Sequence, residues 1–221
     1  MILAAGRGTR MLSLSDKTPK PLLCVHDKSL IEHRIIACKK AGITDIVINV
    51  WHHANLIQTT LGDGSQWGVN IAYSIEDHLL GSGGGIKNAL PLLGHAPFLL
   101  LSADVFSDIG LSSFAKRKTN SCHLALVDNP DHHPEGDYHL DHNTISLKGT
   151  PKLTYAGTSL IDPKWIANIT DTTFSIASAF EAAIAAHLAT GEHFQALWIN
   201  VDTPLRLKRA CSAREQSLQD I

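Results

Sequence analysis

The pattern of apolar and polar positions predicts strands that alternate with helices along the chain. Short, uninterrupted apolar runs predict buried strands, and apolar residues three and four positions apart predict amphipathic helices. The expected strands are 2–5, 45–50, 69–75, 98–103, 123–127, 153–161 and 197–201. The expected helices are 29–40, 55–61, 86–92, 175–189 and 203–214. This order predicts an α/β fold, a Rossmann-like, doubly wound mixed sheet with its ligand at the carboxyl ends of the strands.

Residues at the helix ends agree with this assignment. Ser29 and Glu32 have the spacing of a capping box, and Gly42 follows the helix 29–40 where a left-handed residue is expected. The second half is less regular, because the stretch 128–143 is polar and has little periodicity. No repeat, linker or low-complexity segment interrupts the 221 residues, so we expect one domain.

Composition narrows the class of partner. Hydrophobic residues make up 44% and the formal net charge is −2, so the chain lacks the general basic surface that nucleic acid requires. No apolar run approaches the roughly 20 residues of a membrane span. Four cysteines at wide spacings predict reduced thiols: Cys24, Cys38, Cys122 and Cys211. We therefore expect a cytoplasmic protein without a nucleic-acid or membrane partner.

The first apolar run leads directly into a loop suited to polyphosphate. Residues 3–10 read LAAGRGTR, and Lys20 follows inside a Pro-Lys-Pro sequence. Gly6 and Gly8 let the backbone approach phosphate oxygens and expose N–H groups to them. Arg10 adds a planar fork of donors, and Lys20 adds a compact positive charge. The segment predicts a phosphate-binding loop with two cations.

A Rossmann dinucleotide loop is the alternative for these two glycines. That motif requires a third glycine or alanine at position 11 and a helix beginning there. Position 11 is Met11, and the segment after it is polar and loop-like, with Ser13, Ser15 and Asp16. These residues disfavour a dinucleotide fingerprint.

Two further features lie where ligands bind in such a sheet. A glycine-rich run, Gly-Ser-Gly-Gly-Gly at 81–85, is expected to form a second loop ahead of the helix 86–92. Asp104 comes directly after the apolar run 98–103, at the carboxyl end of a strand. Mg²⁺ takes carboxylate and phosphate oxygens, so Asp104 is the best candidate for a metal ligand.

Together these motifs resemble the sugar-1-phosphate nucleotidyltransferases. The similarity covers Gly-x-Gly-Thr-Arg with Pro-Lys-Pro, the glycines at 83–85, Asp104-Val105 and Thr203-Pro204. It implies a GT-A-like nucleotidyltransferase architecture and an enzyme that uses Mg²⁺. The implied reaction joins a nucleoside triphosphate and a sugar 1-phosphate into a nucleotide sugar and pyrophosphate, with residues 1–120 holding the nucleotide and 121–221 the sugar.

A narrower similarity comes from the polar stretch. Residues 128–138, DNPDHHPEGDY, resemble the Asn-Pro-x-His-His-Pro-x-Gly-Asp-Phe stretch of the N-acetylmuramate 1-phosphate uridylyltransferases of cell-wall recycling. This implies UTP and N-acetylmuramate 1-phosphate as substrates. Mannose 1-phosphate with GTP, or another hexose or heptose 1-phosphate, is the alternative within the class. We expect a monomer or a small homo-oligomer, and, since related chains have a few residues ahead of this first strand, a natural start upstream of Met1.

The resemblance also implies a role for individual residues. The catalytic pair would be Arg10 and Lys20, and the metal ligands Asp104 and Asn200. The sugar would contact Asp137 and Gly157, although Gly157 also fits a simple strand bulge. The nucleotide would contact backbone and small residues: Leu3, Ala4, Ala5, Gly6, Gly8, Thr9, Gly83 and Gly84.

One segment departs from the family pattern. Related enzymes read Trp-x-Asp-x-Gly-Thr-Pro, but here Asn200 replaces the metal-binding aspartate and Asp202 replaces the glycine. Asn200 keeps a carbonyl oxygen without charge, which lowers the expected affinity for Mg²⁺. Asp202 is the alternative ligand, on the same face of a strand about 6.6 Å further along. Because of this departure, an alternative remains that the protein is a degraded relative, which binds a nucleotide sugar but does not catalyse the reaction.

Zinc is the other metal to consider, since the chain has 13 histidines. His132 and His133 are adjacent, so their side chains diverge, and no cysteine or carboxylate set completes a tetrahedron around them. Recognition of a sugar by this stretch fits better than a zinc site, and solvated loop histidines remain the alternative.

Overall fold

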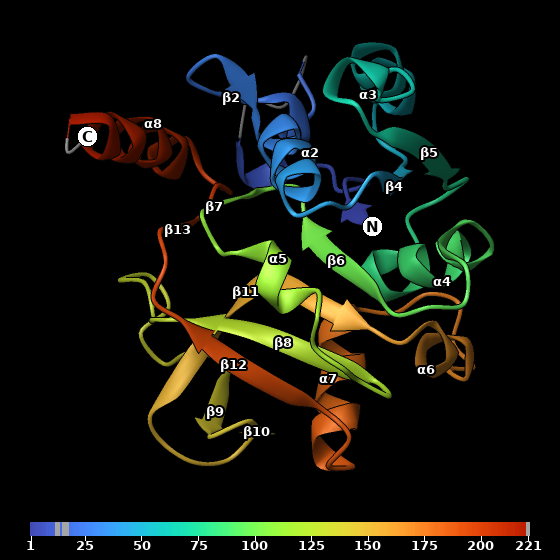
Figure 1. Cartoon of the computed structure of the whole chain (residues 1–221), viewed down its shortest axis with the longest axis vertical. Helices are drawn as coiled ribbons and strands as arrows, with labels where there is room; N and C mark the ends of the chain where they lie inside the picture. Colours follow the sequence, from blue (N-terminus) through green and yellow to red (C-terminus); the bar gives the residue numbers. More distant parts are fainter. Residues whose placement is uncertain (12–13, 15–17, 220–221) are drawn as a thin grey trace.

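The computed structural model describes residues 1–11, 14 and 18–219, with side chains up to residue 213. Ser13, Ser15 and Asp16, which were expected to be loop-like, lie outside the described residues. The described chain forms one large sheet with helices on both faces, and the helix α8 extends away from it (Figure 1).

The large sheet has nine strands in the order β5-β4-β1-β6-β11-β8-β12-β10-β9. Its first four strands are mutually parallel, and β11 runs antiparallel between β6 and β8. The strands are β1 (Ile2–Leu3), β4 (Asp45–Val50), β5 (Asn70–Ile75), β6 (Phe98–Ser102), β8 (Cys122–Val127), β9 (Tyr138–Asp141), β10 (Thr144–Ser146), β11 (Lys152–Ile161) and β12 (Thr190–Phe194). The mixed, doubly wound α/β sheet expected from the sequence is confirmed.

Helices and two short ribbons complete the fold. The α-helices are α2 (Leu30–Lys40), α3 (Ala54–Leu61), α4 (Gly81–Leu93), α5 (Leu111–Phe114), α6 (Pro163–Ala167), α7 (Ile176–Ala185) and α8 (Pro204–Gln219). The ribbons pair β2 (Cys24–Val25) with β3 (Lys28–Ser29) and β7 (Val105–Ser107) with β13 (Trp198–Asn200). The predicted capping box of α2 is present, since Ser29 accepts from the Glu32 amide and Glu32 from the Ser29 amide.

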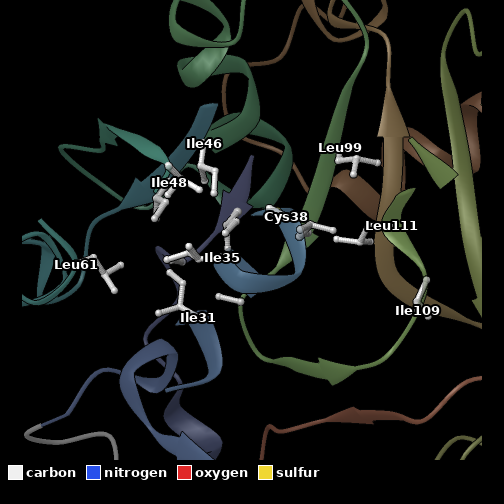
Figure 2. Close-up of a cluster of buried hydrophobic side chains, with 14 of the residues drawn as sticks. Ile31, Ile35, Cys38, Ile46, Ile48, Leu61, Leu99, Ile109 and Leu111 are labelled. Carbon is white, nitrogen blue, oxygen red and sulfur yellow. The ribbon is translucent and has the colours of Figure 1, made fainter. Parts of the chain in front are cut away.

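The alternation of side chains along each strand divides the core between the two faces of the sheet. Leu99 and Leu101 pack in a cluster with α2, α3 and α5, whereas Leu100 packs in a second cluster with α4, α6 and α7. Figure 2 shows the first cluster, in which Ile31 and Ile35 of α2 lie beside side chains of the parallel strands. Burial on both faces explains why these strands read as continuous apolar runs.

The second half of the chain contains strands that the periodicity did not predict. No strand or helix was predicted in the polar stretch 128–143, but its end forms β9, which makes a hairpin with β10. The helix expected to run to residue 189 ends at Ala185, and β12 begins at Thr190. β12 is half-exposed at most positions and pairs in parallel with β8. Pairing with a buried strand, which the sequence pattern does not encode, explains why it forms.

The glycine run 81–85 was predicted to be a loop, and that prediction is wrong. Helix α4 begins at Gly81, so the run forms its first turns. A Cβ on Gly83 would lie 2.2 Å from the Phe174 ring, and one on Gly84 would lie 2.4 Å from the Thr172 carbonyl oxygen. The glycines therefore allow α4 to pack directly against the segment 172–174, whose Phe174 carbonyl accepts from both amides.

We expect Gly83→Ala to destabilise the protein. Alanine favours a helix by about 1 kcal/mol over glycine, but the overlap with the Phe174 ring should cost about 1–3 kcal/mol. Because the penalty comes from the ring, it should shrink when Gly83→Ala is made in a Phe174→Ala background. Urea unfolding of the wild type, the two single variants and the double variant measures both the destabilisation and its reduction in the Phe174→Ala background. A Gly83→Ala variant as stable as the wild type would contradict the packing argument.

Candidate active site

A cleft of about 240 Å³ opens where β1 and β6 end. We call it the sheet-edge cleft. It lies where open α/β sheets place their ligands, beyond the carboxyl ends of parallel strands. Its walls include seven residues predicted from the sequence to form the site: Leu3, Ala4, Ala5, Gly6, Gly8, Lys20 and Asp104.

The other predicted site residues do not line this cleft. Gly83 and Gly84 are buried within α4, directly after Gly81 and Ser82, which do line it. Asn200 lines a second cleft beside α8, and Arg10 pairs with Asp202. The structure thus brings seven of the predicted residues together at the sheet-edge cleft and places Asn200 at a second cleft. Thr9 is exposed and lines neither cleft.

Lys20 and Asp104 form the charged centre of the sheet-edge cleft. Lys20 Nζ lies 2.5 Å from Asp104 Oδ2, so a contact joins the loop after β1 to the end of β6. The Lys20 stem is largely buried against Gly8, whose φ is +64° and whose Cβ, if present, would lie 2.9 Å from the Lys20 Cβ. Gly8 therefore serves both the turn and the close approach of Lys20. An ammonium paired with one carboxylate can exchange that partner for phosphate oxygens.

Asp202 is a buried carboxylate that two arginines neutralise. Its side chain is 1% exposed, Arg10 Nη1 lies 2.5 Å from its Oδ2, and Arg206 Nη1 donates to its Oδ1. The Arg10 side chain is 70% exposed, so this contact ties an exposed loop residue to the start of α8. Asp202 would have to release an arginine before it could bind a metal ion.

Asn200 has the feature expected of an oxygen ligand. It pairs with Val105 across the β7–β13 ribbon, and the next amide, that of Val201, donates to the Asp104 carbonyl over 2.8 Å. Among the described residues, the buried Asn200 Oδ1 has no hydrogen-bond partner. A buried carbonyl oxygen beside the Asp104 backbone fits a hard cation such as Mg²⁺, with one carboxylate and one neutral oxygen from the protein.

Two polar residues that line the sheet-edge cleft, Asn49 and Glu76, were not predicted from the sequence. Asn49 Oδ1 accepts from the Ala4 amide over 3.0 Å, and Asn49 Nδ2 donates to Glu76 Oε1 over 2.7 Å. Both side chains are buried, and a Cβ on Gly85 would lie 2.5 Å from Glu76 Oε1. Asn49 could have been found from the sequence, because it is a polar residue near the end of an otherwise apolar strand.

The residues predicted to contact the sugar have structural partners of their own. Asp137 Oδ1 lies 3.0 Å from His133 Nε2, and its Oδ2 accepts from the Tyr155 amide over 2.7 Å. Gly157 has a φ of +66° and lies where the β11–β8 register shifts, which is the geometry of a bulge. Its missing Cβ would lie 2.9 Å from Ser102 Oγ, so the bulge packs against the end of β6.

The two adjacent histidines diverge as expected. His133 contacts Asp137, whereas His132 lines the cleft beside α8. Burial lowers the pKa of His132 below its ordinary value, and the positive charge of Arg206 lowers it further. Over the described part of the chain, no group of three or more His, Cys, Asp or Glu side chains could hold a metal ion. Over the same part, no helix is both long and apolar enough to cross a membrane.

Comparisons with known proteins agree with this geometry. The family model described as nucleotidyl transferase matches residues 1–138. An N-acetylmuramate alpha-1-phosphate uridylyltransferase of Neisseria meningitidis serogroup B is 40% identical over 220 residues, which cover 95% of each chain. A protein of the same name from Caulobacter vibrioides is 29% identical over 97% of this chain and 95% of its own. A UDP-glucose pyrophosphorylase crystallised with UDP-glucose has a similar fold, with a TM-score of 0.77 at 17% identity, covering 98% of this chain and 97% of its own.

We expect Asp202→Asn to destabilise the fold. The substitution leaves Arg206 without its buried charge partner, which should lower the free energy of unfolding by about 1–3 kcal/mol. Asp131→Asn is the matched control, because Asp131 is 92% exposed and also faces an arginine. That control should stay within about 0.5 kcal/mol of the wild type. Urea unfolding measures both, and equal stabilities would contradict a structural role for Asp202.

Proposed function

The chain belongs to the nucleotidyl transferase family, and on this premise we propose that it transfers a uridylyl group from UTP to N-acetylmuramate 1-phosphate. A phosphate oxygen of the sugar would attack the α-phosphorus, the bond from that phosphorus to the bridging oxygen would break, and pyrophosphate would leave. The observation that carries the proposal is the Lys20–Asp104 pair beside the glycine loop. Identity of 40% along 95% of the chain to a uridylyltransferase of this specificity supports the choice of substrates.

The residues of the loop would act by position and charge. Backbone amides near Gly6 and Gly8 would donate to phosphate oxygens, and Lys20 would turn from Asp104 to the triphosphate. Arg10 lies on the exposed side of the same loop and would add a second cation as charge spreads over the phosphates in the transition state. No side chain needs to act as the nucleophile, because the sugar phosphate attacks directly.

The wall around the nucleotide would be rigid. Asn49 bonds to the Ala4 amide and to Glu76, and Glu76 Oε2 accepts from the Leu80 amide over 3.3 Å. This chain of contacts joins β1, β4 and the start of α4, so the backbone of residues 3–6 is held in place. We assign this backbone and the first turn of α4 to the base and ribose. In this scheme residues 1–120 would bind the nucleotide and residues 121–221 the sugar.

The family is typically metal-dependent, and we propose Mg²⁺ as the metal, held by Asp104 and Asn200. When bound, Mg²⁺ supplies positive charge to the phosphate oxygens. Asp202 fits this role less well, because its Oδ1 accepts from Arg206 and its Oδ2, which accepts no hydrogen bond among the described residues, lies 2.5 Å from Arg10 Nη1. The unpartnered Asn200 Oδ1 supports the assignment, and the loss of one carboxylate should weaken the binding of Mg²⁺. We place the reaction in the cytoplasm, as a step that recovers a cell-wall sugar.

Substrate choice tests the proposal. Purified protein with UTP and Mg²⁺ should release pyrophosphate with N-acetylmuramate 1-phosphate at least roughly 10-fold faster than with glucose 1-phosphate or mannose 1-phosphate, the discrimination typical of pocket contacts. A phosphate-release assay coupled to pyrophosphatase measures the initial rates. A preference for GTP with mannose 1-phosphate would overturn the uridylyl assignment and leave the class of reaction intact.

The metal assignment has its own test. Asn200→Asp restores a charged ligand, so the half-saturating Mg²⁺ concentration should fall roughly 10-fold, or about 1.4 kcal/mol. Initial rates against Mg²⁺ should be measured for the wild type, Asn200→Asp and Asp202→Asn. If Asp202→Asn alone abolished the rate while Asn200→Asp changed little, Asp202 would be the ligand. If the wild type were inactive at every Mg²⁺ concentration and Asn200→Asp restored activity, the protein would instead be a degraded relative. The presence of Asn200 is the observation that favours this second candidate function.

A further inference from the structure

A second cleft, of about 430 Å³, lies beside the first turns of α8, and we call it the α8 cleft. It joins three parts of the chain: the polar stretch after β8, the ribbon strand β13 and the start of α8. None of the reaction steps above uses its lining except Asn200. Its lining is mixed and includes two arginines, several apolar side chains and two aspartates.

The cationic lining residues are Arg206 and Arg209. They are three residues apart on α8, which puts both on the same face of the helix, and both line the cleft. Arg206 is anchored through Nη1 to the buried Asp202. Arg209 Nη1 lies 3.5 Å from Asp131 Oδ2, and both of these side chains are mostly exposed. An exposed ion pair of this kind is weak, so Arg209 can exchange Asp131 for another carboxylate.

The apolar lining residues include Trp198 and Leu205. Trp198 Nε1 donates to the Ala156 carbonyl over 2.9 Å, which fixes the indole in the wall of the cleft. Leu205 is 76% exposed, the highest value among the exposed large hydrophobic residues described. A large aliphatic side chain left open at the rim of a cleft with two arginines is suited to a ligand that carries an alkyl group beside an anion.

The α8 cleft is connected to the phosphate site. Asn200, the proposed metal ligand, lines it, and the Arg10–Asp202–Arg206 contacts run from the phosphate loop to its cationic wall. A sugar whose 1-phosphate lay at the metal would therefore have its substituents close to this cleft. Two carboxylates also line it, Asp128, which contacts His193, and Asp131.

We propose that the α8 cleft binds the carboxylate and methyl group of the sugar's lactyl ether, with Arg209 and Arg206 as the residues that select for it. The proposal rests on the proposed function, because it concerns the substituent that distinguishes N-acetylmuramate from N-acetylglucosamine. Arg209 leaves Asp131 and pairs with the lactyl carboxylate, Arg206 supports it from Asp202, and the methyl group packs against Leu205 and Trp198. An arginine fork suits a carboxylate because two N–H groups can donate to its two oxygens.

The test compares the binding of two sugar phosphates that differ only in the lactyl ether. Dissociation constants for N-acetylmuramate 1-phosphate and N-acetylglucosamine 1-phosphate are measured by calorimetry for the wild type, Arg209→Gln, Arg206→Lys and Lys208→Gln. Lys208 is the matched control, being an exposed cation beside Arg209 that does not line the cleft. Loss of one charged hydrogen-bonding partner should weaken binding of N-acetylmuramate 1-phosphate roughly 10- to 100-fold in Arg209→Gln. Binding of N-acetylglucosamine 1-phosphate should not change.

Arg206→Lys keeps the charge toward Asp202 but loses the fork, so it should weaken N-acetylmuramate 1-phosphate selectively and by less. Equal affinity of the wild type for the two sugars, binding of neither, or equal losses in Arg209→Gln and Lys208→Gln would overturn the proposal. The reaction is tested separately through pyrophosphate release. A wild type that binds the lactyl sugar selectively but releases no pyrophosphate would overturn the proposed reaction and support the subsite.

Discussion

The position at which β1 ends determines most of the site. This strand has only two residues, yet it lies in the sheet between β4 and β6 and pairs in parallel with both. The chain therefore leaves the sheet at Ala4, between the ends of two buried strands. Asn49 fixes that exit by accepting from the Ala4 amide, and the glycine loop that follows can only turn over the sheet edge. Residues 3–6 and Gly8 on this path line the cleft.

Charge then connects the loop to the rest of the chain. Lys20 reaches Asp104 at the end of β6, and Arg10 reaches Asp202 at the start of α8. Each contact joins a cation of the N-terminal loop to a carboxylate far away in the sequence. Asp202 is fully buried and is balanced by two guanidinium groups, whereas the Asp104 side chain is a third exposed and, within the described part of the chain, forms an ion pair with one lysine. The two carboxylates thus differ in what they can do. Asp202 holds structure together, and Asp104 can change partners.

Glycines allow the helices to come close to the sheet edge, and only some of them serve the site directly. Gly8 provides the left-handed turn and the space for Lys20. The glycines of α4 instead let the helix pack on the segment 172–174 and leave room for the Asn49–Glu76 pair. The sequence of a glycine-rich run therefore does not distinguish a close approach to a ligand from a close approach to another part of the chain. The difference lies in which atoms occupy the space where Cβ would be.

The amino-acid sequence by itself determined the class of fold and the order of strands and helices along the chain, and it predicted a phosphate-binding loop. These follow from local signals: uninterrupted apolar runs, the capping box at Ser29, and glycines and cations at short spacing. The same loop, with Asp104 at a strand end, was sufficient to predict the chemistry of the family. Tertiary structure alone decided that Asp202 is paired with two arginines, that Asn49 and Glu76 support the cleft, and that α4 begins at Gly81. It also decided the strands β9, β10 and β12. These features depend on contacts between residues far apart in the chain. Half-exposed or polar segments become ordered by pairing with a buried neighbour, and the local periodicity of the sequence does not indicate which segments will pair.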